Sequence, residues 1–152
     1  MSTIKGLATS EIAAMPQGNK FFAGVYPCDR IPEFDRRPFA VVVNTDPSAE
    51  SGEHWVVLIL KTNEKGLYFD SFGFPPLIPQ LQQYLTAHAP NGFKYNSITL
   101  QHPNSKACGY YCVAFVQLWS KRWTLSRFCT FFAGRMGREL VANDSKLMDL
   151  FV

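Results

Sequence analysis

The stretch from residue 108 to 119 constrains the fold more than any other part of the chain. It runs CGYYCVAFVQLW and is apolar on nearly every side, which is typical of a helix buried in a core. The polar segment before it, 101–107, contains a proline followed by asparagine and serine, residues that favour turns. We therefore predict that Cys108 lies at the N-terminus of a buried helix, which the rest of the fold must cover.

Cys108 has two interpretations. At a helix N-terminus, unpaired N–H groups and the positive end of the helix dipole favour an anion, so this position suits a nucleophilic thiolate. Alternatively, Cys108 and Cys112 are two core thiols on one helix face, the common role of buried cysteine, and the helix alone favours this second interpretation. The spacing also suits a metal pair, but no second ligand pair follows, so we expect no metal site.

Length and composition predict a single domain over residues 1–152 with a large core. Hydrophobic residues make up 47% of the chain and charged residues 18%, which excludes a disordered protein. The net charge of +3 permits contact with nucleic acid without requiring it. With no apolar segment of signal-peptide or membrane-spanning type, we expect an intracellular protein that is not secreted, has free thiols and does not contact a membrane.

Two β-branched apolar runs, 39–45 and 53–60, predict neighbouring central strands. A third strand, 67–70, follows a tight turn, so it forms an antiparallel hairpin with 53–60. His54 opens one strand of this hairpin and Asp70 closes the other, so both side chains are expected at the same end of the sheet. The predicted connections are a polar turn over 46–52 and a tight turn over 63–66.

The remaining segments predict elements around this sheet and helix. They are a short helix over 9–15, an extended segment over 21–26, an irregular surface segment over 27–38, a helix over 77–88, a strand over 93–100 that ends at Gln101, and helices over 126–133, 136–142 and 146–151. Together they predict an α+β fold, with a mostly antiparallel central sheet packed on a buried central helix that begins at Cys108.

The chain offers one candidate for each part of a cysteine protease. Cys108 is the candidate nucleophile, His54 the base and then acid, and Asp70 the carboxylate that orients His54. The side-chain amide of Gln101 and the backbone N–H of Cys108 are the candidate oxyanion donors. Taken singly, these residues are better explained as an ordinary strand-end histidine, turn aspartate and exposed glutamine.

Their order, His, Asp, Gln, Cys, reverses that judgement because it matches a known pattern. The chain resembles the adenovirus-type cysteine proteases, the adenain family, and more distantly the SUMO- and ubiquitin-like-specific proteases. The resemblance covers roughly residues 10 to 125 and is carried by segments in register. They are FAGVY at 22–26, VVNT at 42–45, GEHW at 52–55, FGF at 72–74, ITL at 98–100, and the loop from Gln101 to Gly109.

The resemblance implies a cysteine endopeptidase that cleaves viral precursor proteins at glycine-containing sites and needs no cofactor for its chemistry. It implies a virus or a virus-derived mobile element as the source and, for a virus, a protein in the host nucleus or cytoplasm and in the virion. The implied site residues are the triad His54, Asp70 and Cys108, the oxyanion residues Gln101 and Cys108, and Trp55, Asn104 and Gly109 along the substrate cleft.

Two positions depart from adenain. Asp70 stands where adenain has a glutamate, and aspartate is the choice of the SUMO-protease relatives. Ser97 stands where adenain's activating peptide attaches through a disulfide, so covalent attachment there is excluded. A viral peptide bound without a covalent bond, or a weak DNA contact, stays a candidate activator. Residues after about Trp123 have no counterpart in the resemblance, and their role stays open.

Two alternatives remain at this point. The first is a protease that removes SUMO or ubiquitin from conjugates. The second is a binding module that has the same fold and has lost activity. The presence of all four chemical residues argues against the second alternative, because a degenerate site is expected to lose one of them.

Overall fold

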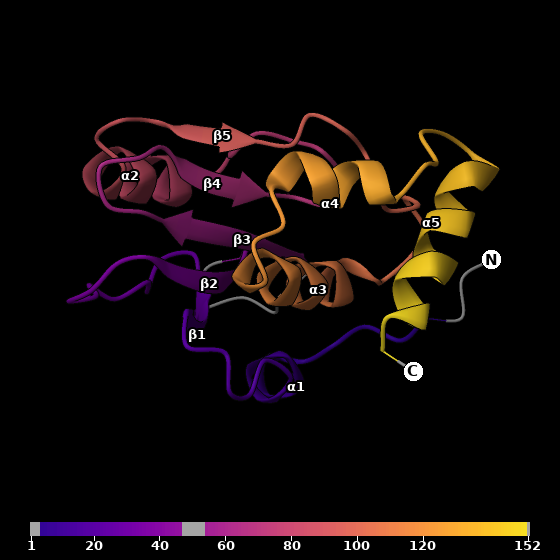
Figure 1. Ribbon diagram of the computed structural model, residues 1–152, viewed down its shortest axis with the longest axis horizontal. Coiled ribbons are helices and arrows are strands. Elements are labelled where there is room, and N and C mark those ends of the chain that lie inside the picture. Colours follow the sequence, from indigo (N-terminus) through magenta and orange to yellow (C-terminus); the bar gives the residue numbers. More distant parts are fainter. Residues whose placement is uncertain (1–3, 47–53, 152) are drawn as a thin grey trace.

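The computed structural model describes residues 4–46 and 54–151 (Figure 1). Its centre is one five-stranded sheet with the strand order β1-β2-β3-β4-β5. The strands are β1 (Phe22–Pro27), β2 (Phe39–Asn44), β3 (Trp55–Leu60), β4 (Gly66–Phe69) and β5 (Phe93–Tyr95). The sheet is accompanied by the helices α1 (Thr9–Ala14), α2 (Pro79–His88), α3 (Cys108–Ser120), α4 (Leu125–Phe131) and α5 (Arg138–Asp149). The predicted α+β class is confirmed.

The sheet is mixed, so the prediction of a mostly antiparallel sheet is wrong. The central pairs β2–β3 and β3–β4 are antiparallel, whereas the outer pairs β1–β2 and β4–β5 are parallel. A parallel pair needs a connection long enough to carry the chain back along the sheet. The irregular segment 28–38 does this between β1 and β2, and α2 with its flanking loops does it between β4 and β5.

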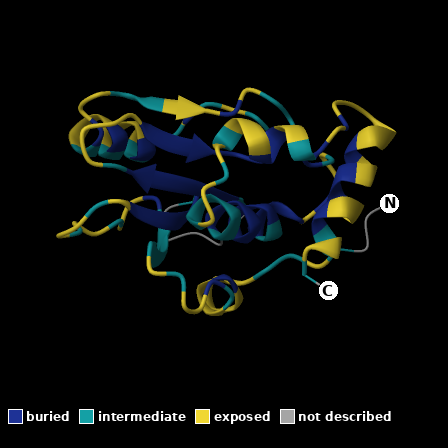
Figure 2. Ribbon diagram, in the orientation of Figure 1, coloured by how far each residue is buried: buried dark blue, intermediate teal, exposed yellow. Residues whose placement is uncertain are grey.

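The two central strands are buried along their whole length because both faces of the sheet are covered (Figure 2). Alternate side chains of β2 and β3 contribute to two separate hydrophobic clusters. One cluster contains the apolar face of α3 and residues of α4, and the other contains Leu81 and Leu85 of α2. The side chains on both faces of β2 and β3 are apolar because both faces of the sheet are covered.

Helix α3 begins at Cys108, as predicted, and eight of its residues are buried. It packs on β2 and β3 and in turn contacts α1, α4 and α5. Figure 1 shows α4 and α5 beside α3, away from the α2 side of the sheet. No helix of the described residues is both long and apolar enough to cross a membrane.

Several predicted boundaries differ from the structure, and two of them concern strands near the site. The strand predicted over 93–100 ends at Tyr95, because the next residue, Asn96, bonds through its side chain to the backbone of Asp70. The strand predicted over 53–60 begins at Trp55, so His54 precedes it directly. Glu53 and most of the turn predicted over 46–52 lie outside the described residues.

The helices predicted over 136–142 and 146–151 are one helix, α5. The prediction separated them because Asn143 and Asp144 are common helix N-caps. In the structure both lie in the middle of α5 and are buried. Their side chains bond to other segments, Asn143 to Gly134 and Asp144 to Tyr111, so they do not compete with the helix backbone.

Candidate active site

A cleft of about 480 Å³ opens at the end of the sheet where β3 begins and α3 begins. Its walls come from the N-terminal segment, the start of β3, the loop after β4 and the loop before α3. The lining residues are Gly6, Leu7, His54, Trp55, Phe72, Gln101, Pro103, Asn104, Ser105, Lys106 and Cys108. The cleft thus brings together side chains that are up to about a hundred positions apart in the sequence.

The His54 ring is held on two sides. Its Nε2 atom lies 2.8 Å from Oδ1 of the buried Asp70, and the same oxygen accepts a 2.8 Å hydrogen bond from the Phe72 backbone N–H. The Phe72 ring stacks on the imidazole, with 4.8 Å between ring centroids and 21° between planes. Nε2 is therefore committed to Asp70, and Nδ1 is the nitrogen left to serve Cys108.

The surroundings of His54 favour the charged imidazolium. Burial is the largest influence and lowers its pKa, but hydrogen bonds with the Asp70 and Cys108 side chains, and the negative charge of both groups, raise it. The net result is that the pKa of His54 rises from 6.5 to about 9. At neutral pH His54 is thus a cation between the Asp70 and Cys108 side chains.

Cys108 is the first residue of α3 and follows Ala107, whose methyl side chain cannot cap the helix. The first N–H groups of a helix have no partner within it, so the N–H of Cys108 is available at the cleft. Cys112, one turn further along, is completely buried, and burial raises the pKa of its thiol well above the ordinary value. The structure therefore distinguishes the two cysteines: Cys108 lines the cleft and Cys112 belongs to the core.

Gln101 is buried, with only 1% of its surface exposed, and its amide is held at both ends. Its Oε1 accepts a 2.5 Å hydrogen bond from the Ser71 hydroxyl, and its Nε2 donates a 2.9 Å hydrogen bond to the Ser105 carbonyl. A carbonyl can only accept, so the amide nitrogen must face Ser105. One N–H of the amide is used in this way, and the second remains for a ligand in the cleft.

Three supports of the site were missed by sequence reasoning, and two of them are the single residues Ser71 and Asn96. Ser71 accepts the backbone N–H groups of Leu100 and Gln101 through its own carbonyl, in addition to its bond to the Gln101 amide. Asn96 clamps the backbone of Asp70, accepting from its N–H at 3.1 Å and donating to its carbonyl at 2.6 Å. Neither a serine after an aspartate nor an asparagine after a short strand is a specific signal in a sequence.

The N-terminal segment is the third support, and it forms one wall of the cleft. The Trp55 indole N–H donates a 3.3 Å hydrogen bond to the Leu7 carbonyl, and both residues line the cleft. Gly109 faces this segment: a Cβ atom added there would lie 3.2 Å from Leu7 and from Ile12. Gly109 was expected along the cleft but is not among the lining residues, because it provides the space for this packing.

Asn104 lines the cleft as expected and is exposed. Its backbone N–H donates a 3.1 Å hydrogen bond to Nδ1 of His102, within the turn before α3. Elsewhere, the residues that the structure describes contain no group of three or more His, Cys, Asp or Glu side chains that could hold a metal ion. None of the four cysteines, all of which lie in the described part of the chain, forms a disulfide.

The similarity of the chain to a known protein agrees with this site. No family model matches the chain. The protein named Protease from bovine adenovirus 2 is 34% identical over 87 residues, which cover 49% of this chain. The predicted resemblance to adenovirus proteases is confirmed over that part of the chain. The chain spans only 42% of the length of this relative.

Two solved structures are also similar to the chain at a lower level. The ASFV pS273R protease is 22% identical with a TM-score of 0.42, and the match covers 72% of this chain and 43% of that one. The SUMO protease Ulp1 is 15% identical with a TM-score of 0.35, covering 72% and 53%. TM-scores below 0.5 are too low to support an inference about this chain.

Proposed function

We propose that this chain is a cysteine endopeptidase of the adenovirus type. The observation that carries the proposal is the position of His54 between Asp70 and Cys108, the first residue of the buried helix α3. In this position the pKa of His54 is about 9. A cysteine nucleophile works as a thiolate beside an imidazolium. A buried histidine that stays charged at neutral pH is suited to that pairing.

In the proposed acylation step, Cys108 Sγ attacks the carbonyl carbon of the scissile peptide bond. The carbonyl oxygen becomes an oxyanion that accepts from the backbone N–H of Cys108 and from the second N–H of the Gln101 amide. The tetrahedral intermediate then collapses as His54 Nδ1 donates its proton to the leaving amine. The products of this step are a free amine and a thioester on Cys108.

In the proposed deacylation step, neutral His54 takes a proton from a water molecule that attacks the thioester carbonyl. The new carboxylic acid leaves, and the thiolate and imidazolium pair forms again. Asp70 accepts from Nε2 throughout, which keeps the ring in the orientation that presents Nδ1 to Cys108. These steps use the described side chains and water, and they call for no cofactor.

The substrates that we propose are polypeptides, specifically viral precursor proteins cut at glycine-containing sites. The support is the adenovirus relative and the cleft that Cys108 and His54 line together with Leu7 and Trp55. The protein would then act in the virion and in the host nucleus or cytoplasm.

A deconjugating protease for SUMO or ubiquitin is the second candidate. The observation that favours it is Asp70, an aspartate as in the SUMO-protease relatives, at 2.8 Å from His54. The glycine-terminated tail of such a modifier would occupy the same cleft. A ubiquitin or SUMO vinyl sulfone distinguishes the two enzymes, because it would label Cys108 of the deconjugase rapidly and Cys108 of the precursor protease slowly.

An activator bound without a covalent bond, a peptide or DNA, is a further part of the proposal. A second cavity of about 900 Å³ lies between the edge strand β5 and the α3–α4 connection, and it includes Ser97. Three cationic side chains line it, those of Lys61, Lys94 and Arg122, and no acidic side chain does so among the described residues. Acidic peptides or DNA are therefore the activators to test first, by adding each to the peptidase assay.

The deciding experiment measures the alkylation rate of each cysteine by iodoacetamide against pH, read by mass spectrometry. We expect Cys108 to react rapidly near about pH 6, where an ordinary thiol is almost fully protonated, and His54→Ala to abolish this reactivity. Cys129, whose pKa burial raises to about 11, is the internal reference. Equal rates at Cys108 and Cys129 mean either a latent site that awaits its activator or a binding module. Equal rates that persist when an acidic peptide or DNA is added would contradict the protease proposal and favour the binding module.

A further inference from the structure

Helix α5 buries two polar side chains at its centre, Asn143 and Asp144, each 3% exposed. The helix supplies none of the cleft-lining residues in the described part of the chain. Burying an amide and a carboxylate is costly unless each has hydrogen-bond partners. The partners of these two side chains therefore indicate what α5 does for the rest of the molecule.

Asn143 holds the residue that precedes the candidate oxyanion residue. Its Nδ2 donates a 3.1 Å hydrogen bond to the Leu100 carbonyl and a 3.0 Å hydrogen bond to the Gly134 carbonyl. Its Oδ1 accepts from the Gly134 N–H at 2.9 Å. Since the Leu100 N–H donates to Ser71 on the other side at 2.9 Å, Leu100 is fixed at both its polar groups.

Asp144 holds the helix that begins at the nucleophile. Its Oδ1 accepts a 2.8 Å hydrogen bond from the hydroxyl of Tyr111, which is completely buried three residues after Cys108. The same hydroxyl lies 3.2 Å from the Leu100 carbonyl. A phenol has one proton and faces two acceptors here, so Tyr111 joins α3, α5 and Leu100 at a single point.

The surroundings of Asp144 also include the loop before α3. Burial raises the pKa of Asp144, and hydrogen bonds of its carboxyl group with Tyr111, Ser105 and the His102 backbone lower it. Oδ2 is buried without a hydrogen-bond partner of ordinary geometry among residues 4–46 and 54–151. Both loop residues belong to the segment between Gln101 and Cys108.

We propose that Asn143 and Asp144 are positioning residues, through which α5 fixes the two ends of the segment that carries both oxyanion donors. Asn143 acts at Leu100, the residue before Gln101, and Asp144 acts through Tyr111 on the first turn of α3, where the Cys108 N–H lies. The proposal rests on the protease function proposed above. It assigns a role to the part of the chain beyond Trp123, which the sequence left without one.

The test uses two probes of the intact chain that depend on different parts of the site. Iodoacetamide alkylates a thiolate without forming an oxyanion, so it reports on the Cys108–His54 pair. A peptide aldehyde ending in Gly-glycinal adds reversibly to Cys108 and places an oxyanion between the two donors. A change in oxyanion positioning should therefore weaken aldehyde binding and leave the alkylation rate unchanged.

The variants remove or keep the polar contacts of α5. Tyr111→Phe removes the shared hydroxyl, and Asp144→Leu removes its acceptor while filling the space. We expect each to weaken aldehyde binding by about tenfold or more, since a displacement of ~1 Å at a reacting group can cost about 100-fold. Asp144→Asn keeps an acceptor for Tyr111 and should restore binding to within about threefold of the original chain.

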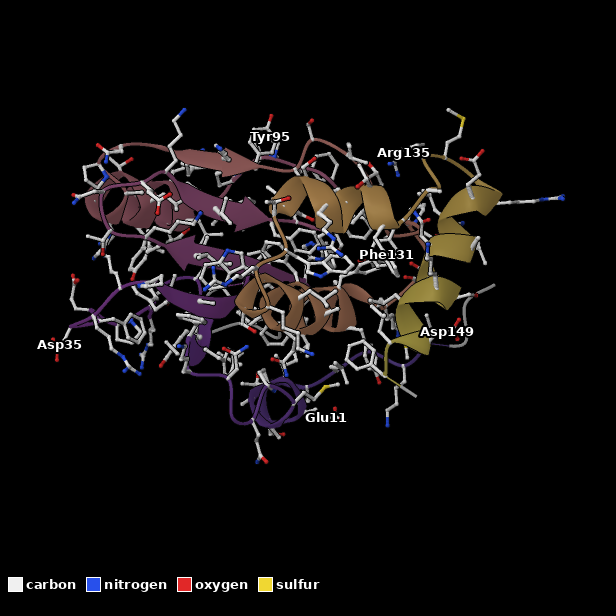
Figure 3. The ribbon with its side chains drawn as sticks, in the orientation of Figure 1. Glu11, Asp35, Tyr95, Phe131, Arg135 and Asp149 are labelled. Atoms are coloured by element: carbon white, nitrogen blue, oxygen red, sulfur yellow. The ribbon has the colours of Figure 1, made fainter. Side chains whose placement is uncertain are left out.

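Two controls separate positioning from stability. Leu147→Ala removes a completely buried side chain of α5 and should lower the melting temperature without weakening aldehyde binding by the folded protein. Asp149→Asn changes an exposed residue on the same helix (Figure 3) and should change neither property. Gln101→Ala is the reference for loss of an oxyanion donor.

The outcomes distinguish the two proposals. Slow alkylation of Cys108 in the original chain, both with and without an acidic peptide or DNA, contradicts the protease function itself. Alternatively, Cys108 is alkylated rapidly but Gln101→Ala does not weaken aldehyde binding. Gln101 is then not an oxyanion donor, and the positioning role of Asn143 and Asp144 is overturned. The role is also overturned if Asp144→Leu and Tyr111→Phe weaken aldehyde binding no more than Leu147→Ala does.

Discussion

At the scale of single residues, the folded structure changes the charge of His54. Burial alone would keep the imidazole neutral, but Asp70 and Cys108 reverse this and raise its pKa to about 9. Each of these neighbours reaches His54 from a different element: Asp70 follows β4, and Cys108 begins α3. The charge on His54 is therefore a property of the folded state.

The raised pKa of His54 predicts a pH-dependent stability. A histidine whose folded pKa exceeds its ordinary value of 6.5 stabilises the fold fully below about pH 6.5, and this contribution is lost as the pH rises through about 9. We expect the free energy of unfolding of the original chain to fall over this window by at most about 3.5 kcal/mol, at about 1.4 kcal/mol for each pKa unit.

Urea denaturation at several pH values measures this dependence. In His54→Ala the contribution of this group is absent, so the difference in stability between the two proteins should shrink between about pH 6.5 and pH 9. A difference that stays constant over the window would contradict the charged state assigned to His54.

At the scale of elements, the site depends on how the chain turns after β4. The residues that follow β4 each support the site. Asp70 bonds to His54, Ser71 bonds to the Gln101 amide and the Phe72 ring stacks on His54. Gly73 then reverses the direction of the chain with φ +81°. A Cβ atom at Gly73 would lie 2.8 Å from the Ile98 carbonyl carbon. The turn thus lies directly against the segment that leads to Gln101, and only glycine permits this contact.

Gly73→Ala is expected to destabilise the fold by about 1–3 kcal/mol and to slow the alkylation of Cys108, because the clash moves the turn that carries Asp70. The measurement is the urea midpoint together with the alkylation rate. Gly92→Ala is the matched control: its φ is +86°, but no atom lies within 4 Å of the added methyl group. If Gly92→Ala is equally destabilising, the close approach at Gly73 has no effect of its own.

At the scale of the whole molecule, the sheet separates two hydrophobic clusters, and the site lies on the side of α3. The cluster under α3 is rich in aromatic rings: Phe115 stacks on Phe69 with 4.9 Å between centroids and meets Phe128 edge-on at 5.2 Å. Phe69 ends β4 directly before Asp70. The aromatic cluster and the candidate active site are therefore built on the same two elements, β4 and α3.

Phe115→Ala should cost about 3–5 kcal/mol, since it deletes a completely buried aromatic side chain and leaves a cavity between α3, α4 and the sheet. Thermal or urea unfolding measures the loss. Leu77→Ala, at a side chain that is 66% exposed, should change stability by less than about 0.5 kcal/mol. A loss below about 1 kcal/mol for Phe115→Ala would show that the cluster repacks and is not the rigid support described here.

Several features were predictable from the sequence because they depend on local patterns. The doubly apolar runs of β2 and β3 predict central strands, and the tight turn between β3 and β4 predicts their antiparallel pairing. The polar loop followed by an apolar run predicts a helix that begins at Cys108. The placement of His54 and Asp70 at one end of the sheet follows from that pairing alone.

Other features were decided only by contacts between segments distant in the sequence. The parallel pairing of β1 with β2, and of β5 with β4, depends on which edge of the sheet each outer strand reaches. No local sequence pattern predicts this. Asn143 and Asp144 have the sequence properties of helix caps, but their bonds to Gly134, Leu100 and Tyr111 place them inside α5. A polar side chain can satisfy its hydrogen bonds locally or far away in the chain, and only the tertiary structure determines which partners it finds.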